Sequence, residues 1–279
     1  MADAPMGPLR DLPRDTLRVK GPDRKTWLDG LLTCAVTAVA PGSAGYGLLL
    51  TKQGKIVSDA YLLDNGQELF VGVAPGRGAE VRELLDRYLV MEDAELEQPA
   101  EALSWRIGDQ AAAGALTSGA LALGGWQTEL ALASGASGGL ANAAALLAEH
   151  GLGVYGVDFG ERDNPHEASL DRIAVCWTKG CYLGQEVVCM QDMRGKVKRR
   201  LVALDADAAL LGALQSAPQP VQVLGTDGGA VGQVSSVHEH AGGVRILASI
   251  STPALESQAA LSLLGRPVRV AVGSASNLS

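Results

Sequence analysis

The sequence predicts an α+β domain with two related halves, followed by a small C-terminal β-barrel. Residues 46–91 contain three strand-like segments and a helix, and residues 103–150 repeat this series less clearly. From residue 196 onward helical periodicity fades, and short β-type segments alternate with Gly, Pro and Asp turns. The 279 residues suffice for about two domains. We therefore expect domains at residues 1–193 and 194–279.

The first half of the α+β domain begins with a predicted helix at residues 22–33. Pro22 suits the first turn of a helix, and Trp27, Leu28 and Leu31 fall on one apolar face. The D-N-G sequence that begins at Asp64 is a strong signal for a hairpin turn. Three strands are expected around it, at residues 46–50, 55–63 and 68–73.

A longer helix is predicted at residues 77–91, because Val81, Leu85 and Tyr88 recur at helical spacing. The second half is expected to hold two strands, at residues 103–107 and 126–133, and a helix at residues 142–150. Barrel strands are predicted at residues 197–204, 221–224, 230–237, 244–250 and 268–272.

Composition excludes several classes of function. The net charge of −8 and the pI of about 5.0 argue against nucleic acid or an anionic membrane as the main partner, because both need clustered positive charge. Four cysteines form no disulfide framework in a chain of this size and fit a reducing compartment. No signal peptide and no membrane span are expected. A cytoplasmic protein is therefore the expectation.

Three of the four cysteines lie between residues 164 and 200, with the spacing C-x4-C-x7-C. Structural zinc sites usually show close C-x2–4-C pairs, so no metal site is expected. Cys181 differs from the other cysteines because it follows Lys179-Gly180 and precedes Tyr182-Leu183-Gly184-Gln185-Glu186. If a helix begins at Gly184 or Gln185, its free N–H groups and Lys179 would favour the thiolate of Cys181. The alternative is an inert cysteine in a tight turn.

A basic segment follows the cysteine-rich stretch. Five of seven residues from Arg194 to Arg200 are cationic in a chain that is otherwise acidic. These side chains form either a solvated strand face or a local site for an anion such as a carboxylate tail. The cations are Arg194, Lys196, Lys198, Arg199 and Arg200.

With these residues in view, the chain resembles the YgfZ family, folate-binding relatives of the glycine-cleavage T-protein that support iron–sulfur protein maturation. The run at residues 179–186 (K-G-C-Y-L-G-Q-E) is similar to that family's K-G-C-[FY]-x-G-Q-E motif. Further similarity lies in N-P-H-E-A-S-L from Asn164, in R-G followed by K-R after Arg194, and in W-L-D-G-L-L-T from Trp27. The hairpin at residues 50–59 resembles the D-x-K-G-K-x-x-x-D/N theme.

The resemblance implies a T-protein-like domain that binds tetrahydrofolate or a derivative in a central channel, followed by a β-barrel. Residues 149–156 resemble the T-protein's E-A-G-L-x-L-Y-G, so Glu149 would accept N–H donors of the pterin. The alternative for Glu149 is a surface acid at a helix end. Cys181 would be the functional thiol. The residues that would position the thiol and the folate are Lys179, Tyr182, Gln185, Glu186 and Arg194.

Three functions remain open at this point. The first is a folate-binding accessory protein whose partners are reduced folate and iron–sulfur proteins or their assembly factors. The second is a folate-dependent aminomethyl or one-carbon transferase, with Asp59 and Glu149 carrying the chemistry. This chain has Ser58-Asp59 where the T-protein has two adjacent acids, which argues against transfer. The third is a scaffold that binds assembly partners and no small molecule.

Overall fold

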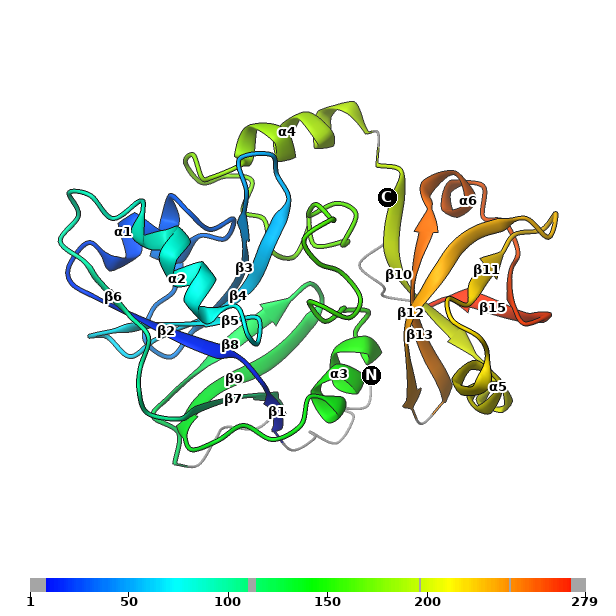
Figure 1. Ribbon diagram of the computed structural model, residues 1–279, viewed down its shortest axis with the longest axis horizontal. Coiled ribbons are helices and arrows are strands. Elements are labelled where there is room, and N and C mark those ends of the chain that lie inside the picture. Colours follow the sequence, from blue (N-terminus) through cyan, green and yellow to red (C-terminus); the bar gives the residue numbers. More distant parts are fainter. Residues whose placement is uncertain (1–8, 110–113, 196, 241, 272–279) are drawn as a thin grey trace. The chain divides into compact units, whose positions relative to one another are not determined.

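The computed structural model describes residues 9–109, 114–195, 197–240 and 242–271 (Figure 1). Lys196 of the basic segment lies outside the described residues. The chain divides into two compact units. Unit 1 comprises Met1–Ala143 and Arg172–Val187, and unit 2 comprises Ala144–Asp171 and Val188–Ser279. The domain division that we expect after residue 193 stays a prediction.

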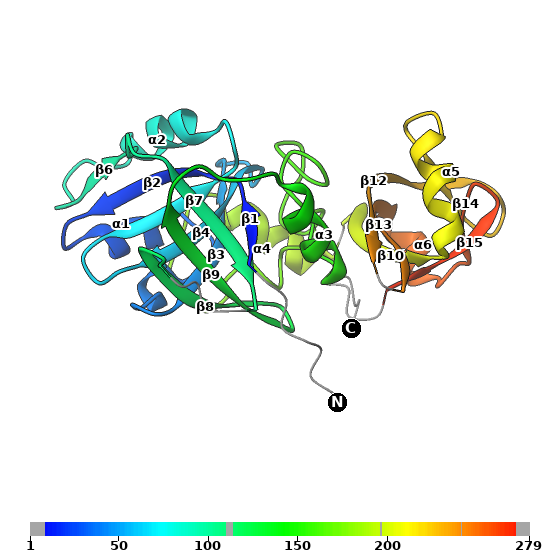
Figure 2. The same cartoon turned by 90° about the horizontal axis from the view of Figure 1, so that it is seen from below.

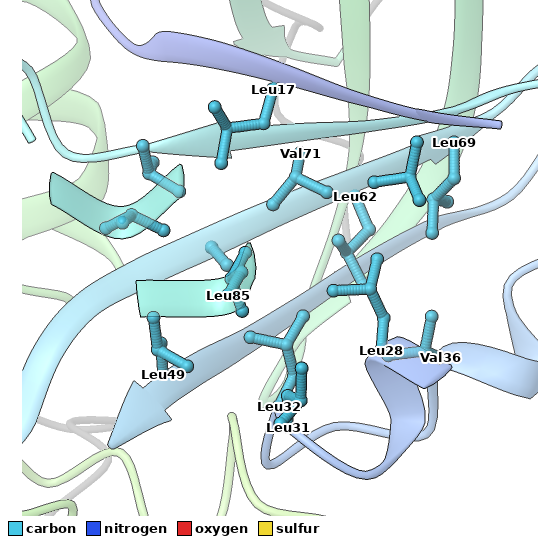
Figure 3. Packing of buried hydrophobic residues seen from close by; sticks show 14 of the residues in the cluster. Leu17, Leu28, Leu31, Leu32, Val36, Leu49, Leu62, Leu69, Val71 and Leu85 are labelled. Atoms are coloured by element: carbon cyan, nitrogen blue, oxygen red, sulfur yellow. The ribbon is translucent and has the colours of Figure 1, made fainter. Parts of the chain in front are cut away.

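Unit 1 contains a five-stranded antiparallel sheet in the order β3-β4-β5-β2-β6. Side chains from α1 (Arg24–Asp29) and α2 (Gly78–Asp86) pack on one face of this sheet, where Leu28 and Leu85 meet Leu62 and Val71 (Figure 3). This cluster is the main hydrophobic core of the unit. The strands are β2 (Asp15–Lys20), β3 (Ala44–Leu50), β4 (Ile56–Asp64), β5 (Leu69–Val73) and β6 (Glu95–Glu97).

A second antiparallel sheet in unit 1 has the order β1-β7-β9-β8 (Figure 2). Its Trp105 packs on the other face of the first sheet, because a Cβ at Gly72 would lie 2.7 Å from the indole ring. The indole nitrogen of Trp105 also donates to Thr16 Oγ1 at 2.9 Å. The strands are β1 (Arg10–Leu12), β7 (Leu103–Gly108), β8 (Thr117–Leu123) and β9 (Trp126–Ser134).

The two sheets of unit 1 share one arrangement. In each, an early strand pairs with the last strand before the helix, as β2 does with β5 and β7 with β9, while β1 adds to the second sheet beside β7. That last strand also forms a hairpin with the strand before it, giving β4–β5 and β8–β9. The helices that follow are α2 and α3 (Ala141–Glu149). The predicted α+β architecture with related halves is confirmed.

The two helices of the first half are shorter than predicted, and four strands of unit 1 are additional to the prediction: β1, β2, β6 and β8. After α1 and α2 the backbone tightens into i→i+3 hydrogen bonds, from Gly30 to Trp27 and from Tyr88 to Leu85, while apolar spacing continues. The Tyr88 carbonyl accepts from the indole of Trp27 at 3.0 Å instead of from a further helical turn. The Ala- and Gly-rich β8 carries little strand propensity of its own and is held by its pairing with β9.

Unit 2 is built on a closed barrel, which confirms the predicted C-terminal fold. Its order is β10-β13-β12-β11-β14-β15, around an interior that includes Val202, Ile246 and Leu263. The structure adds three elements that were not predicted: the short helices α5 (Leu211–Ser216) and α6 (Thr252–Glu256) and the strand β14 (Leu261–Leu263). The other strands are β10 (Arg199–Ala206), β11 (Gln222–Leu224), β12 (Ala230–His240), β13 (Gly243–Ser251) and β15 (Arg266–Val270).

Residues 144–171 of unit 2 are attached to this barrel by polar contacts. The Leu201 amide donates to the Glu167 carbonyl at 2.8 Å, and the Ser236 hydroxyl donates to Asp158 Oδ1 at 2.6 Å. Arg200 forms a two-point ion pair with Asp171, at 3.0 and 3.4 Å. Over the described part of the chain, no helix has the length and apolar character needed to cross a membrane.

Candidate functional site

The K-G-C-Y-L-G-Q-E run lies against the end of α1, within unit 1. A helix end leaves its last carbonyls without partners in the helix, and here the run and the residues just before it donate to the backbone after α1. The Leu183 amide donates to the Gly30 carbonyl at 3.1 Å, and the Cys176 amide donates to the Thr33 carbonyl at 2.9 Å. The Thr33 hydroxyl donates back to the Ala174 carbonyl at 2.6 Å. Segments about 145 residues apart in sequence are thereby joined.

Lys179 is the centre of this junction. Its ammonium donates to the carbonyls of Asp29, Leu32 and Cys34, at 2.5, 3.0 and 2.7 Å. It also pairs with the Asp29 carboxylate at 3.2 Å, with only 5% of the lysine side chain exposed. A cation beside the free carbonyls of a helix C-terminus is favourable, so Lys179 fixes the run to α1.

The second half of the run packs closely against the turn between β3 and β4. Gly184 has φ +81°, and a Cβ there would lie 2.5 Å from the Thr51 carbonyl oxygen. On the opposite side, a Cβ at Gly54 would lie 3.0 Å from Val187. Only glycine fits this approach at a positive φ. The helix α4 (Gln185–Arg194) begins directly after it, with Glu186 exposed in its first turn.

Cys181 is exposed at the turn between these two anchors. Tyr182, the next residue, is buried, with its ring centroid 5.7 Å from the Lys179 ammonium. The thiol therefore lies on a short exposed turn whose neighbours on both sides are fixed.

Two other cysteines lie near Lys179, and sequence reasoning did not single them out. Burial raises the pKa of the Cys34 thiol to about 12, although the Lys179 charge acts against this. At Cys176 the net effect is the opposite. Burial acts to raise the pKa of this thiol, but hydrogen bonds from Thr178 and from the Lys179 backbone, together with the Lys179 charge, outweigh burial, so the pKa is lowered. No sequence spacing could have shown which thiol Lys179 faces.

Asp59 lies in a closed cluster between the two sheets of unit 1. Its side chain is 1% exposed and accepts a hydrogen bond from Arg14 Nη1 at 2.5 Å. The Tyr46 hydroxyl lies 3.4 Å from the other carboxylate oxygen. The Arg14 guanidinium lies 4.7 Å from the ring centroid of Tyr61. The sequence alone did not indicate Arg14, Tyr46 and Tyr61 as partners, because Arg14 lies 45 residues from Asp59 and no motif joins them.

The charges in this cluster compensate one another. Burial by itself lowers the pKa of Arg14, but the Asp59 carboxylate together with Tyr61 and Tyr46 outweighs it, and the pKa of the guanidinium is raised. Burial raises the pKa of the Tyr46 hydroxyl well above its ordinary value. Ser58 is fully buried, and its hydroxyl accepts from the Ala74 amide at 2.9 Å. The Asp59 carboxylate is thus enclosed and neutralised by a cation.

Glu149 and Arg194 belong to unit 2. Glu149 ends α3 with an exposed side chain, and its carbonyl accepts from Arg245 at 2.7 Å. Arg194 is the last residue of α4 and is exposed. Of the basic segment, Arg199 pairs with Asp163 at 2.8 Å and Arg200 with Asp171. These two arginines already have internal carboxylates as partners.

A half-buried aspartate, Asp158, was also missed. Asp158 accepts from the Val154 amide at 2.8 Å and from the Ser236 hydroxyl at 2.6 Å. Burial raises its pKa to about 6, against these hydrogen bonds. His238 Nε2 lies 3.0 Å from the same hydroxyl, and burial lowers the pKa of this histidine. The described residues contain no group of three His, Cys, Asp or Glu side chains placed to hold a metal ion.

Comparison with known proteins gives the fold. No protein-family model matches the chain. The crystal structure of glycine cleavage system aminomethyltransferase T from Bartonella henselae superposes with a TM-score of 0.69, covering 95% of this chain and 85% of that one, at 14% identity. This chain has a T-protein-like fold. An aminomethyltransferase from Cutibacterium acnes is 38% identical over 73 residues, which are 25% of this chain. The match spans only 20% of the length of that relative.

Proposed function

We propose that the protein is a tetrahydrofolate-binding accessory protein of the YgfZ type, which supports iron–sulfur cluster assembly or repair with Cys181 as its functional thiol. The observation that carries the proposal is the exposed Cys181 between two fixed neighbours, in a T-protein-like fold. Lys179 and Gly184 hold the turn, so the thiol is presented in one defined position. The proposal assigns folate binding to a domain of residues 1–193, with the barrel at 194–279, in a cytoplasmic protein.

Folate binding is proposed to depend on Glu149. A pterin offers adjacent N–H donors, and one exposed carboxylate can accept two of them. The folate supplies one-carbon chemistry when bound, while this chain's residues would bind and orient it. Tyr182, Gln185, Glu186 and Arg194 are proposed as further contacts. Lys179 would act through the position of the run, because its ammonium already has four acceptors.

The folate proposal is tested by titration calorimetry of the full chain with tetrahydrofolate and its 5-formyl derivative. We expect binding, and we expect Glu149→Gln to weaken it about tenfold or more, as for a lost charge-assisted hydrogen-bond pair. Glu239→Gln, also an exposed acid of unit 2, serves as the matched control and should bind as the unsubstituted protein does. Absence of heat and of competition with either folate would reject the site.

A second candidate is folate-dependent aminomethyl transfer. The 73-residue similarity to a protein named aminomethyltransferase favours it. The surroundings of Asp59 argue against it, because a general acid or base must reach the reacting atom and Asp59 is enclosed with Arg14. Turnover of an aminomethyl donor to methylene-tetrahydrofolate by the unsubstituted chain, abolished in Asp59→Asn, would establish transfer in place of the accessory role.

A further inference from the structure

Unit 1 has a pocket of about 390 Å³ beside the K-G-C-Y-L-G-Q-E run. Three parts of the unit line it: the end of β3 with its turn, the last turn of α2 with the residues after it, and the run itself. The residues are Leu50, Thr51 and Lys52, then Leu84, Arg87 and Tyr88, then Leu183.

The pocket has an apolar floor and a cationic rim. Leu50 is fully buried, while Leu84, Tyr88 and Leu183 are half-buried and pack against the hydrophobic core. Lys52 and Arg87 are exposed. The pair that Arg87 forms with Glu83 at 2.5 Å leaves both side chains about two-thirds exposed, at 67% and 72%. An ion pair this exposed is weak, so the Arg87 charge remains available to a ligand.

Two exposed apolar residues follow the pocket lining in sequence. Val90 and Met91 follow Tyr88 closely in sequence and are 80% and 91% exposed. Large apolar side chains exposed to this degree beside a pocket are typical of a surface that contacts another protein. The positive rim is also local, because the whole chain carries a charge of −8. The charge that complements this rim is negative.

The pocket is fixed in shape by the contacts that hold the run. Gly184 meets the Thr51 carbonyl and Gly54 meets Val187, so the wall at Lys52 and the wall at Leu183 are joined. The wall at Tyr88 is held by the hydrogen bond from Trp27 to its carbonyl. A preformed pocket loses less entropy on binding than one that must be ordered first.

We propose that this pocket docks an acidic segment of the partner protein, with an apolar side chain on the leucine floor and flanking carboxylates on Lys52 and Arg87. The inference rests on the proposed function and names the partner chemistry of that same site. Cys181 is two residues from Leu183, within about 7 Å along the chain, so a segment docked here reaches the exposed thiol. The partner is therefore recognised beside the thiol that would act on it.

The test is fluorescence anisotropy with the full chain and a labelled synthetic peptide in which leucine and phenylalanine are flanked by two glutamates on each side. We expect saturable binding that weakens as salt is raised. The double substitution Lys52→Glu and Arg87→Glu should weaken binding at least about tenfold. Arg82→Glu is the matched control, because Arg82 is exposed on α2, the helix that Arg87 directly follows, but does not line the pocket. It should change binding less than about twofold.

Three results would overturn the docking proposal. They are no binding at about 1 mM peptide, equal binding of a peptide with lysines in place of the glutamates, and equal loss with Arg82→Glu. Folate titration of the same proteins separates the two proposals. If the protein binds folate but not the peptide, only the docking proposal is wrong. If the unsubstituted chain binds no folate, the proposed function on which the docking proposal rests is wrong.

Discussion

The two candidate centres of unit 1 differ in their access to a reaction partner. The Asp59 centre is closed: the carboxylate is 1% exposed, and a guanidinium at 2.5 Å compensates its charge. The Cys181 centre is open: the thiol is exposed, and only its neighbours are buried or fixed. A T-protein-like fold can therefore keep an acid at the hairpin as part of its core and present a different chemical group at its surface.

The two centres also differ in how their side chains contribute to the free energy of unfolding. Around Asp59 the polar groups stabilise one another, and removing one leaves a buried charge. Around Cys181 the stabilising contacts belong to Lys179, Leu183 and Gly184, whereas the thiol contributes none that folding needs. Substitutions at the two centres should therefore differ widely in their effect on the free energy of unfolding.

The largest effect is expected at Arg14. Arg14→Leu leaves the Asp59 carboxylate buried without its cation, which costs about 3–5 kcal/mol of the free energy of unfolding. Chemical denaturation measures this loss. The double variant Arg14→Leu, Asp59→Leu removes both charges and should recover most of the stability. A single Arg14→Leu variant as stable as the unsubstituted protein would show that the cluster is not closed.

A smaller effect is expected at Lys179. Lys179→Met leaves three carbonyls, one at the end of α1 and two in the residues after it, without their donor, at a cost of about 2–3 kcal/mol. The loss should be accompanied by faster amide hydrogen exchange at Leu183, because the run is no longer fixed. Lys179→Arg keeps the charge and should retain part of the stability. Unchanged exchange at Leu183 in Lys179→Met would contradict the role given to the lysine.

Asp158 in unit 2 differs from Asp59 in its partners, which are a hydroxyl and an amide in place of a cation. Burial raises the pKa of Asp158 to about 6. A carboxyl with a raised pKa in the folded state stabilises the protein below pH 4, and this contribution is lost as the pH rises through 6. Relative to Asp158→Asn, the unsubstituted protein should lose on the order of 2 kcal/mol between pH 4 and pH 7.5. Denaturation curves at these two pH values measure it, and a difference independent of pH would contradict the assignment.

Hydrophobic periodicity was sufficient to predict most of the architecture. The hairpin strands of the first sheet and the barrel strands follow from alternation and turn residues, and the helix start after Gly184 follows from the glycine. The ends of α1 and α2 could not be predicted, because distant donors such as Lys179 and Trp27 take the carbonyls that would have continued each helix. Helices α5 and α6 are too short for periodicity to reveal.

The candidate site was predictable only in part. The run at residues 179–186 is visible in the sequence, because its glycines and charged residues are unusual in combination. The partners of Asp59 were not visible, since Arg14, which directly precedes β2, approaches Asp59 on β4 only when β2 pairs with β5 and β5 pairs with β4. For the same reason, spacing could not show that the Lys179 charge acts on Cys176.

The smallest effect on stability and the largest on function are expected at Cys181, and this pair of measurements tests the account most directly. Cys181→Ser should change the free energy of unfolding by less than about 0.5 kcal/mol, because the thiol is exposed. In a host that lacks its own YgfZ-type protein, we expect this variant to fail to restore iron–sulfur enzyme activity, while Cys176→Ser restores it. Full restoration by a stably folded Cys181→Ser would contradict the proposed role of the thiol.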